Sequence, residues 1–162
     1  TRAGENTMGD ADNDGDIART VAEEMYALDS AARGLGIVID EVDNNSARVS
    51  MVVREDMLNS HRICHGGVMF TLADTAFAYA CNSRNVSTLA LSCSIDFVEA
   101  VALGEKLTAV AEKKIRKRRT GVYDVTVSNE NGDTVAIFRG NSYQLKAESV
   151  PGLNDKLGLD KT

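Results

Sequence analysis

The chain has 162 residues, of which 43% are hydrophobic and 26% are charged, and its formal net charge is −6. This length fits one domain with its own hydrophobic core, and the composition excludes wholesale disorder and the fibrous classes. The negative charge argues against general affinity for nucleic acid and for anionic membrane surfaces.

Signals for membranes, export and disulfides are weak. The longest apolar stretch, residues 68–81, has only fourteen residues and contains Asp74, so it is too short for a membrane span. The polar first residues lack the cationic start and apolar centre of a signal peptide. Three cysteines without a CxxC pair argue against a disulfide framework and a Cys-rich zinc site. We therefore expect a cytoplasmic protein with reduced thiols and no membrane, nucleic-acid or metal partner.

The two ends of the chain differ in composition from the middle. Residues 1–16 are rich in Asp, Asn and Gly and predict a disordered or appended tail. Over residues 17–33, apolar side chains recur at helical spacing between a capping candidate, Asp16, and Gly34, which predicts an amphipathic helix. Residues 147–162 contain the only proline and predict a second, flexible tail. The expected domain therefore spans residues 17–146.

Alternating apolar residues predict six strands in this domain. They lie at residues 36–42, 46–54, 89–97, 107–111, 123–127 and 134–145. Between the second and the third lies one helix, residues 68–81, which is apolar on all sides. Such a helix must be buried on all sides, and a sheet curled around it would bury it. The pattern predicts an α+β fold in which a sheet wraps one central helix.

Asp74 is the one carboxylate of the predicted central helix. An ionised carboxylate is costly there unless it is paired or faces water, and burial raises its pKa toward the range useful for base chemistry. From the residues alone, two interpretations stay open. Asp74 either holds the fold together by bonding to Thr71, Thr75 or a distant Arg, or it takes part in catalysis.

Two glycines, Gly66 and Gly67, precede the predicted helix. Backbone N–H groups at a helix start lack intrahelical partners and suit a carbonyl oxygen that gains negative charge, although two glycines also serve a tight turn. Asp74 lies about 12 Å along the helix axis from Gly66, so one helix cannot easily bring both groups to one atom. We therefore predict a composite site that is built from two copies of the chain joined through strand edges.

Other chemistries near the helix start are less favoured. His61, Cys64 and His65 could bind a metal with Asp74, but their HxxCH spacing is not a standard zinc pattern. Cys64 beside His65 could form a nucleophilic pair, yet neighbours in sequence usually point apart. We assign no metal and no cofactor.

Residues 58–83, LNSHRICHGGVMFTLADTAFAYACNS, resemble the hotdog-fold thioesterases of phenylacetic acid degradation. Further similar segments are SIDF at 94–97, TGVYDV at 120–125 and AIFRGNS at 136–142, and the resemblance covers roughly residues 20–146. It implies the hotdog fold, an antiparallel sheet wrapped around one helix, which agrees with the element order.

The resemblance also implies an activity and a set of site residues. The activity is hydrolysis of an acyl-CoA thioester, typically phenylacetyl-CoA or a hydroxylated relative. The motif places the catalytic carboxylate on Asp74, the carbonyl-polarising amide on Gly66 and supporting polar groups on Asn59 and His65. In the family these groups meet across a homodimer, and dimers commonly pair into homotetramers. Gly67 and Thr75 are further candidates for substrate contacts.

A run of basic residues, KKIRKRR at 113–119, is a candidate phosphate site. Arg116, Lys117 and Arg118 could meet the phosphates of CoA with help from Arg139, or the run could be a solvated strand end. The absence of interleaved aromatic residues argues against nucleic acid.

Residues 99 and 100 depart from the family pattern, which usually has a basic residue and proline where this chain has Glu99 and Ala100. Two alternatives to hydrolysis remain open from the sequence. The first is a hotdog protein that binds acyl-CoA or acyl-carrier-protein thioesters, or dehydrates them, without hydrolysis. The second is a structural homo-oligomer in which Asp74 is inert.

Overall fold

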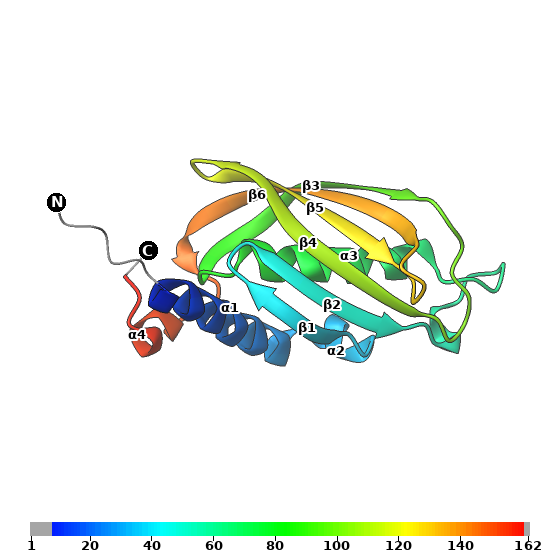
Figure 1. Cartoon of the computed structure of the whole chain (residues 1–162), viewed down its shortest axis with the longest axis horizontal. Coiled ribbons are helices and arrows are strands. Elements are labelled where there is room, and N and C mark those ends of the chain that lie inside the picture. Colours follow the sequence, from blue (N-terminus) through cyan, green and yellow to red (C-terminus); the bar gives the residue numbers. More distant parts are fainter. Residues whose placement is uncertain (1–7, 161–162) are drawn as a thin grey trace.

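A six-stranded antiparallel sheet curls around one long helix in the computed structural model, which describes residues 8–160 (Figure 1). The helices are α1 (Met8–Leu28), α2 (Ser30–Gly34), α3 (Gly66–Cys81) and α4 (Leu153–Leu157). The strands are β1 (Val38–Asp43), β2 (Ser46–Val52), β3 (Val86–Phe97), β4 (Lys106–Lys117), β5 (Thr120–Ser128) and β6 (Thr134–Glu148). They are arranged in the order β1-β2-β4-β5-β6-β3. The predicted α+β wrap is confirmed.

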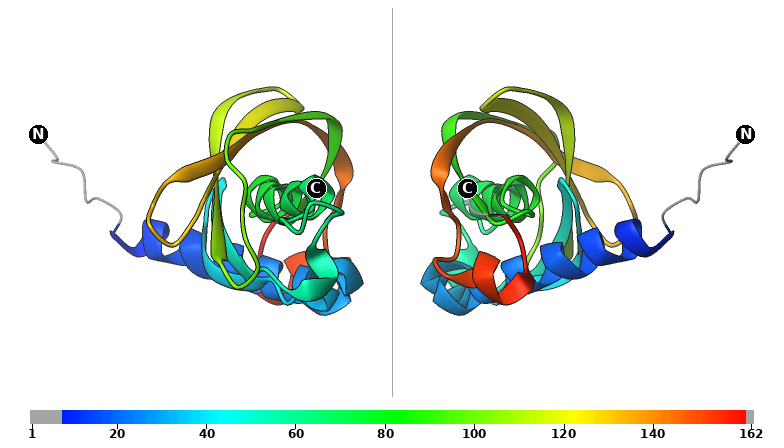
Figure 2. Two further views of the ribbon diagram at one scale, coloured as in Figure 1. Left: turned by 90° about the vertical axis from the view of Figure 1, so that its right-hand side faces the viewer. Right: turned by 90° about the vertical axis from the view of Figure 1, so that its left-hand side faces the viewer.

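The core lies between α3 and the concave face of the sheet (Figure 2). Alternate residues of β4 and β5, including Ala109 and Val125, are fully buried on this face, as the predicted two-residue period requires. On α3, the Phe77 ring packs edge-on against Tyr123, with ring centroids 5.5 Å apart. It also covers Gly140 of β6, where an added Cβ atom would lie 2.7 Å from the ring. A glycine at this position therefore lets α3 approach the sheet closely.

The two edges of the sheet are covered differently. Helix α1 packs along β1, whereas β3 has no strand or helix on its outer side within residues 8–160 (Figures 1 and 2). Strand β3 also exposes large apolar side chains: Leu89 is 55% exposed, Leu91 is 63% exposed and Phe97 is 50% exposed. An open edge with exposed apolar residues is a surface on which another strand can pair.

The N-terminal helix is longer than predicted and is divided in two. Helix α1 begins at Met8, so residues 8–16 are helical and do not form a tail; residues 1–7 lie outside the described part. An ion pair between Asp14 and Arg84 attaches this extension to the loop after α3, a tertiary contact that composition does not reveal. The helix ends at Leu28, because the Asp29 carboxylate accepts the Ala32 N–H (2.9 Å) and starts α2.

The C-terminal segment is also packed instead of loose. Strand β6 continues to Glu148, and Leu153 of α4 is buried against Ile17 and Val21 of α1. The side chain of Asn154 is buried and accepts a hydrogen bond from Asn85 (2.8 Å). The expected tail after residue 146 was wrong because these contacts join it to the domain. Among residues 8–160, no helix is both long and apolar enough to cross a membrane.

Candidate functional site

The first turn of α3 presents one free backbone donor. The His65 Nδ1 atom accepts the Gly67 N–H (2.9 Å), and the His65 carbonyl oxygen accepts the Val68 N–H (2.9 Å). The Gly66 N–H donates to no acceptor in the described part of the chain. Because the positive end of the helix dipole adds to this donor, Gly66 can stabilise an oxygen that becomes negative. Gly67, which is also a predicted substrate contact, has already used its N–H in the cap.

The loop before α3 is held by Asn59. Its side-chain oxygen accepts the N–H groups of His61 (2.9 Å) and Ile63 (3.3 Å), and its own N–H donates to the Ile63 carbonyl oxygen (2.9 Å). The N–H of Cys64 donates to Val101 (2.8 Å) and joins this loop to the segment after β3. Asn59 therefore shapes the approach to Gly66, and its amide group keeps two N–H donors for a ligand.

A groove of about 310 Å³ opens beside Gly66. Its lining comes from the loop before α3, the start of α3 and the segment after β3: Asn59, Ile63, Cys64, Gly66, Met69, Phe97, Val98, Glu99 and Ala100. The structure thus brings Asn59 and Gly66 together, with His65 at the helix cap. The two departures from the family pattern, Glu99 and Ala100, lie in this groove and therefore bear directly on the site.

Asp74 lies two turns further along α3 and outside that groove. Its neighbours on the helix have other partners, since the Thr71 hydroxyl donates to the Gly67 carbonyl oxygen (3.0 Å) and the Thr75 hydroxyl to that of Thr71 (2.7 Å). No side chain from residue 13 to residue 160 forms a hydrogen bond or ion pair with the Asp74 carboxylate. This geometry disfavours the interpretation that Asp74 holds the fold together.

The environment of Asp74 suits a base. Burial of the side chain, and then the charge of the nearby Asp29 carboxylate, raise the pKa of Asp74 above its usual value. A half-buried carboxylate with a raised pKa and no protein partner is free to take a proton from water or to attack a carbonyl carbon. Thr75 is buried and its hydroxyl donates within the helix, so the structure does not present it to a substrate as it does the groove residues.

The predicted phosphate contacts occupy two separate places. Arg116, Lys117 and Arg118 are exposed at the β4–β5 hairpin, where Arg118 adopts a positive φ of 58° in the turn. Arg139 lies on the convex face of the sheet, since its neighbours in β6 face the core, and its guanidinium binds the Asp124 carboxylate (2.6 and 2.9 Å). This ion pair lowers the pKa of Asp124. The structure does not bring Arg139 together with the hairpin cations.

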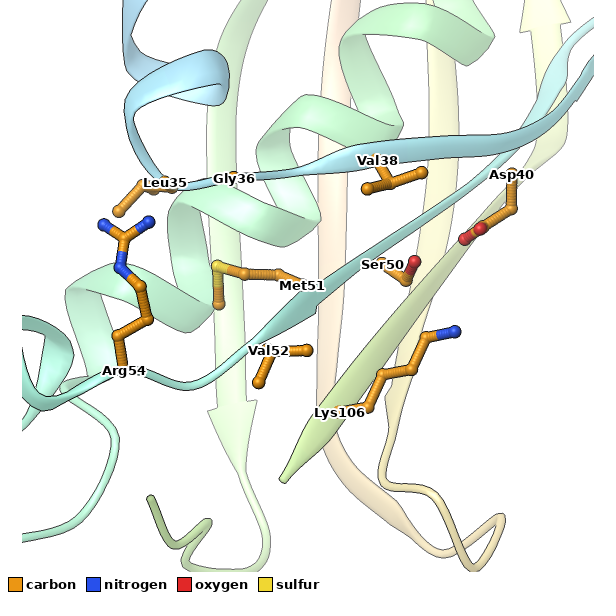
Figure 3. Close-up of a pocket in the computed structure, with 9 residues that line it drawn as sticks. All are labelled: Leu35, Gly36, Val38, Asp40, Ser50, Met51, Val52, Arg54 and Lys106. Carbon is orange, nitrogen blue, oxygen red and sulfur yellow. The ribbon is translucent and has the colours of Figure 1, made fainter. Parts of the chain in front are cut away.

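A second groove, of about 340 Å³, lies on the convex face over β1, β2 and β4 (Figure 3). It contains none of the predicted site residues. One of its cations, Arg54, is bound to Asp56 (3.0 Å) and to the Gly34 carbonyl oxygen (2.9 Å). The groove beside Gly66 is therefore the better candidate site.

Two residues near the site were not predicted from the sequence. Phe97 packs against Gly66, and Asp29 lies close enough to Asp74 to affect its pKa. In the sequence, Phe97 stood out only as an apolar residue of an alternating strand and as the last residue of the SIDF segment, and neither indicated a contact with Gly66. Asp29 gave no signal, because the predicted helix ran through it without a break.

Comparisons with known proteins point to one family. Residues 61–136 match the thioesterase superfamily. The chain is 47% identical over 124 residues to the acyl-coenzyme A thioesterase PaaI of Escherichia coli (strain K12), which covers 76% of this chain and 89% of that protein. The solved structure of E. coli PaaI, from the phenylacetic acid degradation operon, superposes with a TM-score of 0.82 at 44% identity and covers 83% of this chain and 98% of that one.

A more distant solved structure contains coenzyme A, which is the thiol part of the expected acyl-CoA substrate. It is a hypothetical thioesterase of Streptococcus pneumoniae with coenzyme A, and it matches with a TM-score of 0.67 at 26% identity. The match covers 70% of this chain and 91% of the streptococcal chain.

Proposed function

This chain belongs to the thioesterase superfamily, as a PaaI-type acyl-CoA thioesterase, and we propose its substrate class and the roles of its site residues. The substrate is phenylacetyl-CoA or a hydroxyphenylacetyl-CoA, and the products are the free acid and CoA. One observation carries this proposal: within the described part of the chain, α3 presents a backbone donor without an acceptor at Gly66 and a carboxylate without a partner at Asp74. The origin of E. coli PaaI, an operon for phenylacetic acid degradation, supports the choice of acyl group.

The active site is completed by a second copy of the chain. Strand β3 begins after the end of α3 and ends with Phe97 beside Gly66, so it runs back along the helix. Antiparallel pairing of two β3 edges with the two-fold axis near the Phe97 end of the strand would place the start of each α3 near the middle of the other. Gly66 of one chain and Asp74 of the other would then flank one substrate, which overcomes their separation of about 12 Å on a single helix.

The roles follow from these positions. The thioester oxygen accepts the Gly66 N–H, which favours the negative charge that develops there as the carbonyl carbon is attacked. Asp74 of the other chain either attacks that carbon or takes a proton from the attacking water. The C–S bond then breaks and the CoA sulfur leaves as a thiol. If Asp74 is the base, it returns to the sulfur the proton that it took from water; if Asp74 is the nucleophile, the sulfur takes a proton from solvent and a water molecule then hydrolyses the acyl–Asp74 anhydride to release the free acid. Asn59 orients the water or the carboxylate through its amide, and His65 holds the helix cap.

The hairpin cations bind the CoA phosphates. Arg116 is in register with Gly121 and, through β5 and β6, with Ser142 and Ala90, so the hairpin lies at the end of the sheet where β3 begins. It therefore lies beyond Asp74 in the direction away from Gly66. Arg116, Lys117 and Arg118 have no acidic partner among the side chains of residues 13–160 and are therefore available to phosphate.

Thiol release from purified protein tests the activity. We expect turnover of phenylacetyl-CoA to exceed that of short aliphatic acyl-CoAs. Tight CoA binding without release of thiol from any ester would favour the non-hydrolytic alternative. We further propose that dimers pair into tetramers in the cytoplasm.

Mixed dimers test the composite site. Asp74→Asn removes the carboxylate, and Gly66→Pro removes the amide hydrogen at a helix position that tolerates proline. If each site uses both chains, co-expression of the two inactive variants restores about a quarter of wild-type activity, because half of the dimers are mixed and each has one intact site. If each chain contains a whole site, the mixture stays inactive.

A further inference from the structure

Phe97 forms one wall of the groove beside the Gly66 amide. It ends β3, where it pairs with Ala136 of β6. A Cβ atom added to Gly66 would lie 3.0 Å from Cζ of the Phe97 ring and 3.3 and 3.4 Å from its two Cε atoms. The tip of the ring therefore packs against the Gly66 backbone, beside the N–H group that receives the thioester oxygen.

The rest of the ring is open to the groove. Phe97 is 50% exposed in spite of its contact with Gly66, and it lines the groove with Met69 and Val98. The backbone behind it is fixed, because the N–H groups of Val98 and Glu99 both donate to the Val135 carbonyl oxygen (2.8 and 3.2 Å). An aromatic ring on a fixed backbone, with one surface free in a mostly apolar groove, is suited to contact a ligand.

We propose that Phe97 selects aromatic acyl groups by packing against the aryl ring of the substrate. This inference rests on the proposed function. In phenylacetyl-CoA a single methylene separates the carbonyl carbon from the ring, so a carbonyl on the Gly66 N–H brings that ring close to Phe97. Pairs of aromatic rings prefer edge-to-face or offset contacts with centroids about 4.5–7 Å apart, and these contacts add to the effect of apolar burial.

The test compares two acyl groups of similar size. Phenylacetyl-CoA and cyclohexylacetyl-CoA have the same number of carbon atoms, but only the first has an aromatic ring. Phe97→Leu keeps an apolar side chain and removes the protein ring. We expect this variant to lower the ratio of the kcat/KM values, phenylacetyl over cyclohexylacetyl, roughly threefold to tenfold. Ile137→Ala, an exposed change on the convex face of β6, should leave the ratio unchanged.

The outcomes separate this inference from the proposed function. An equal loss for both esters in Phe97→Leu, with a wild-type melting temperature and wild-type dimer content, would overturn the selection role. An unchanged ratio with full activity would overturn it as well. If the wild-type protein hydrolyses neither ester, the proposed function itself fails. Phe97→Tyr, which retains the ring, should preserve the ratio and thereby attribute the effect to aromaticity.

Discussion

The first and third turns of α3 belong to one helix but differ in what they can bind: the first presents a hydrogen-bond donor and the third an acceptor. The first turn ends in the Gly66 N–H, a neutral donor at the positive end of the helix dipole, and the groove leaves it accessible. The third turn contains the Asp74 carboxylate, an acceptor whose pKa is raised by its partly buried position and by Asp29. Neither has a protein partner within residues 13–160. Both groups are therefore available for the composite site that we propose.

Removal of the carboxylate should have the largest effect. Asp74→Asn keeps the size of the side chain but cannot act as a base or nucleophile, so we expect kcat to fall about 10²–10⁴-fold. Steady-state thiol release measures the loss. Thr71→Val, a change one turn earlier on the helix, is the matched control. Wild-type turnover in Asp74→Asn would remove the third turn from the mechanism.

Removal of the amide donor should have the second-largest effect on kcat. Gly66→Pro deletes the N–H, and the loss of one such donor lowers kcat about 10²–10³-fold in comparable sites. Gly66→Ala keeps the N–H and adds only a Cβ atom against the Phe97 ring, which is partly exposed and can shift. We therefore expect a milder loss for alanine. Equal losses in the two variants would show that the space at Gly66 matters and its hydrogen bond does not.

The hairpin cations should affect binding more than chemistry. Changing Arg116, Lys117 and Arg118 together to Ala should raise KM for acyl-CoA by about tenfold, since exposed cations bind phosphate through screened contacts. The value of kcat should change little, because the hairpin lies away from Gly66 and Asp74. Arg139→Ala is the control, since Arg139 is bound to Asp124 on the convex face of the sheet and lies away from the hairpin. An unchanged KM at low salt would contradict the assignment.

The smallest expected effect is a change in pH dependence. Activity that needs ionised Asp74 falls as the pH drops through its pKa, and the raised pKa places this fall above the ordinary Asp range near about 3.9. Asp29→Asn removes one cause of the shift, so the acidic limb of kcat/KM should move to lower pH. Asparagine also serves as a helix cap, and α2 should persist. An acidic limb that does not move in Asp29→Asn would leave burial as the sole cause of the raised Asp74 pKa.

The sequence predicted the central part of the fold well because periodicity is a local property. The β1–β2 hairpin, the buried helix and the four later strands all follow from apolar spacing and turn residues. The ends were predicted poorly because their order depends on distant contacts. Asp14 reaches Arg84, and Asn154 reaches Asn85, and neither contact leaves a local pattern.

The site was predicted in part for the same reason. Gly66 and Asp74 could be singled out because a glycine pair before a helix and a carboxylate within an apolar helix are both unusual, and only the family resemblance then gave them roles. Arg139 was grouped with the hairpin cations by charge alone, although it lies between Phe138 and Gly140, whose side of β6 faces the core. Attention to that alternation would have placed Arg139 on the convex face. The neighbours Phe97 and Asp29 depend on tertiary packing and could not be found from spacing.

The His65 cap has a consequence for the end of the reaction. The His65 side chain accepts the Gly67 N–H, and the His65 carbonyl oxygen accepts the Val68 N–H. The helix start therefore offers a single free donor, the Gly66 N–H. One donor matches the single oxygen of a thioester, whereas the acid that is released has two equivalent, charged oxygens. The helix start satisfies only one of these oxygens, and in the proposed composite site the Asp74 carboxylate of the other chain would lie close by, where like charges repel. We therefore expect the acid to dissociate readily, so that the shape of the cap favours turnover by holding the product weakly.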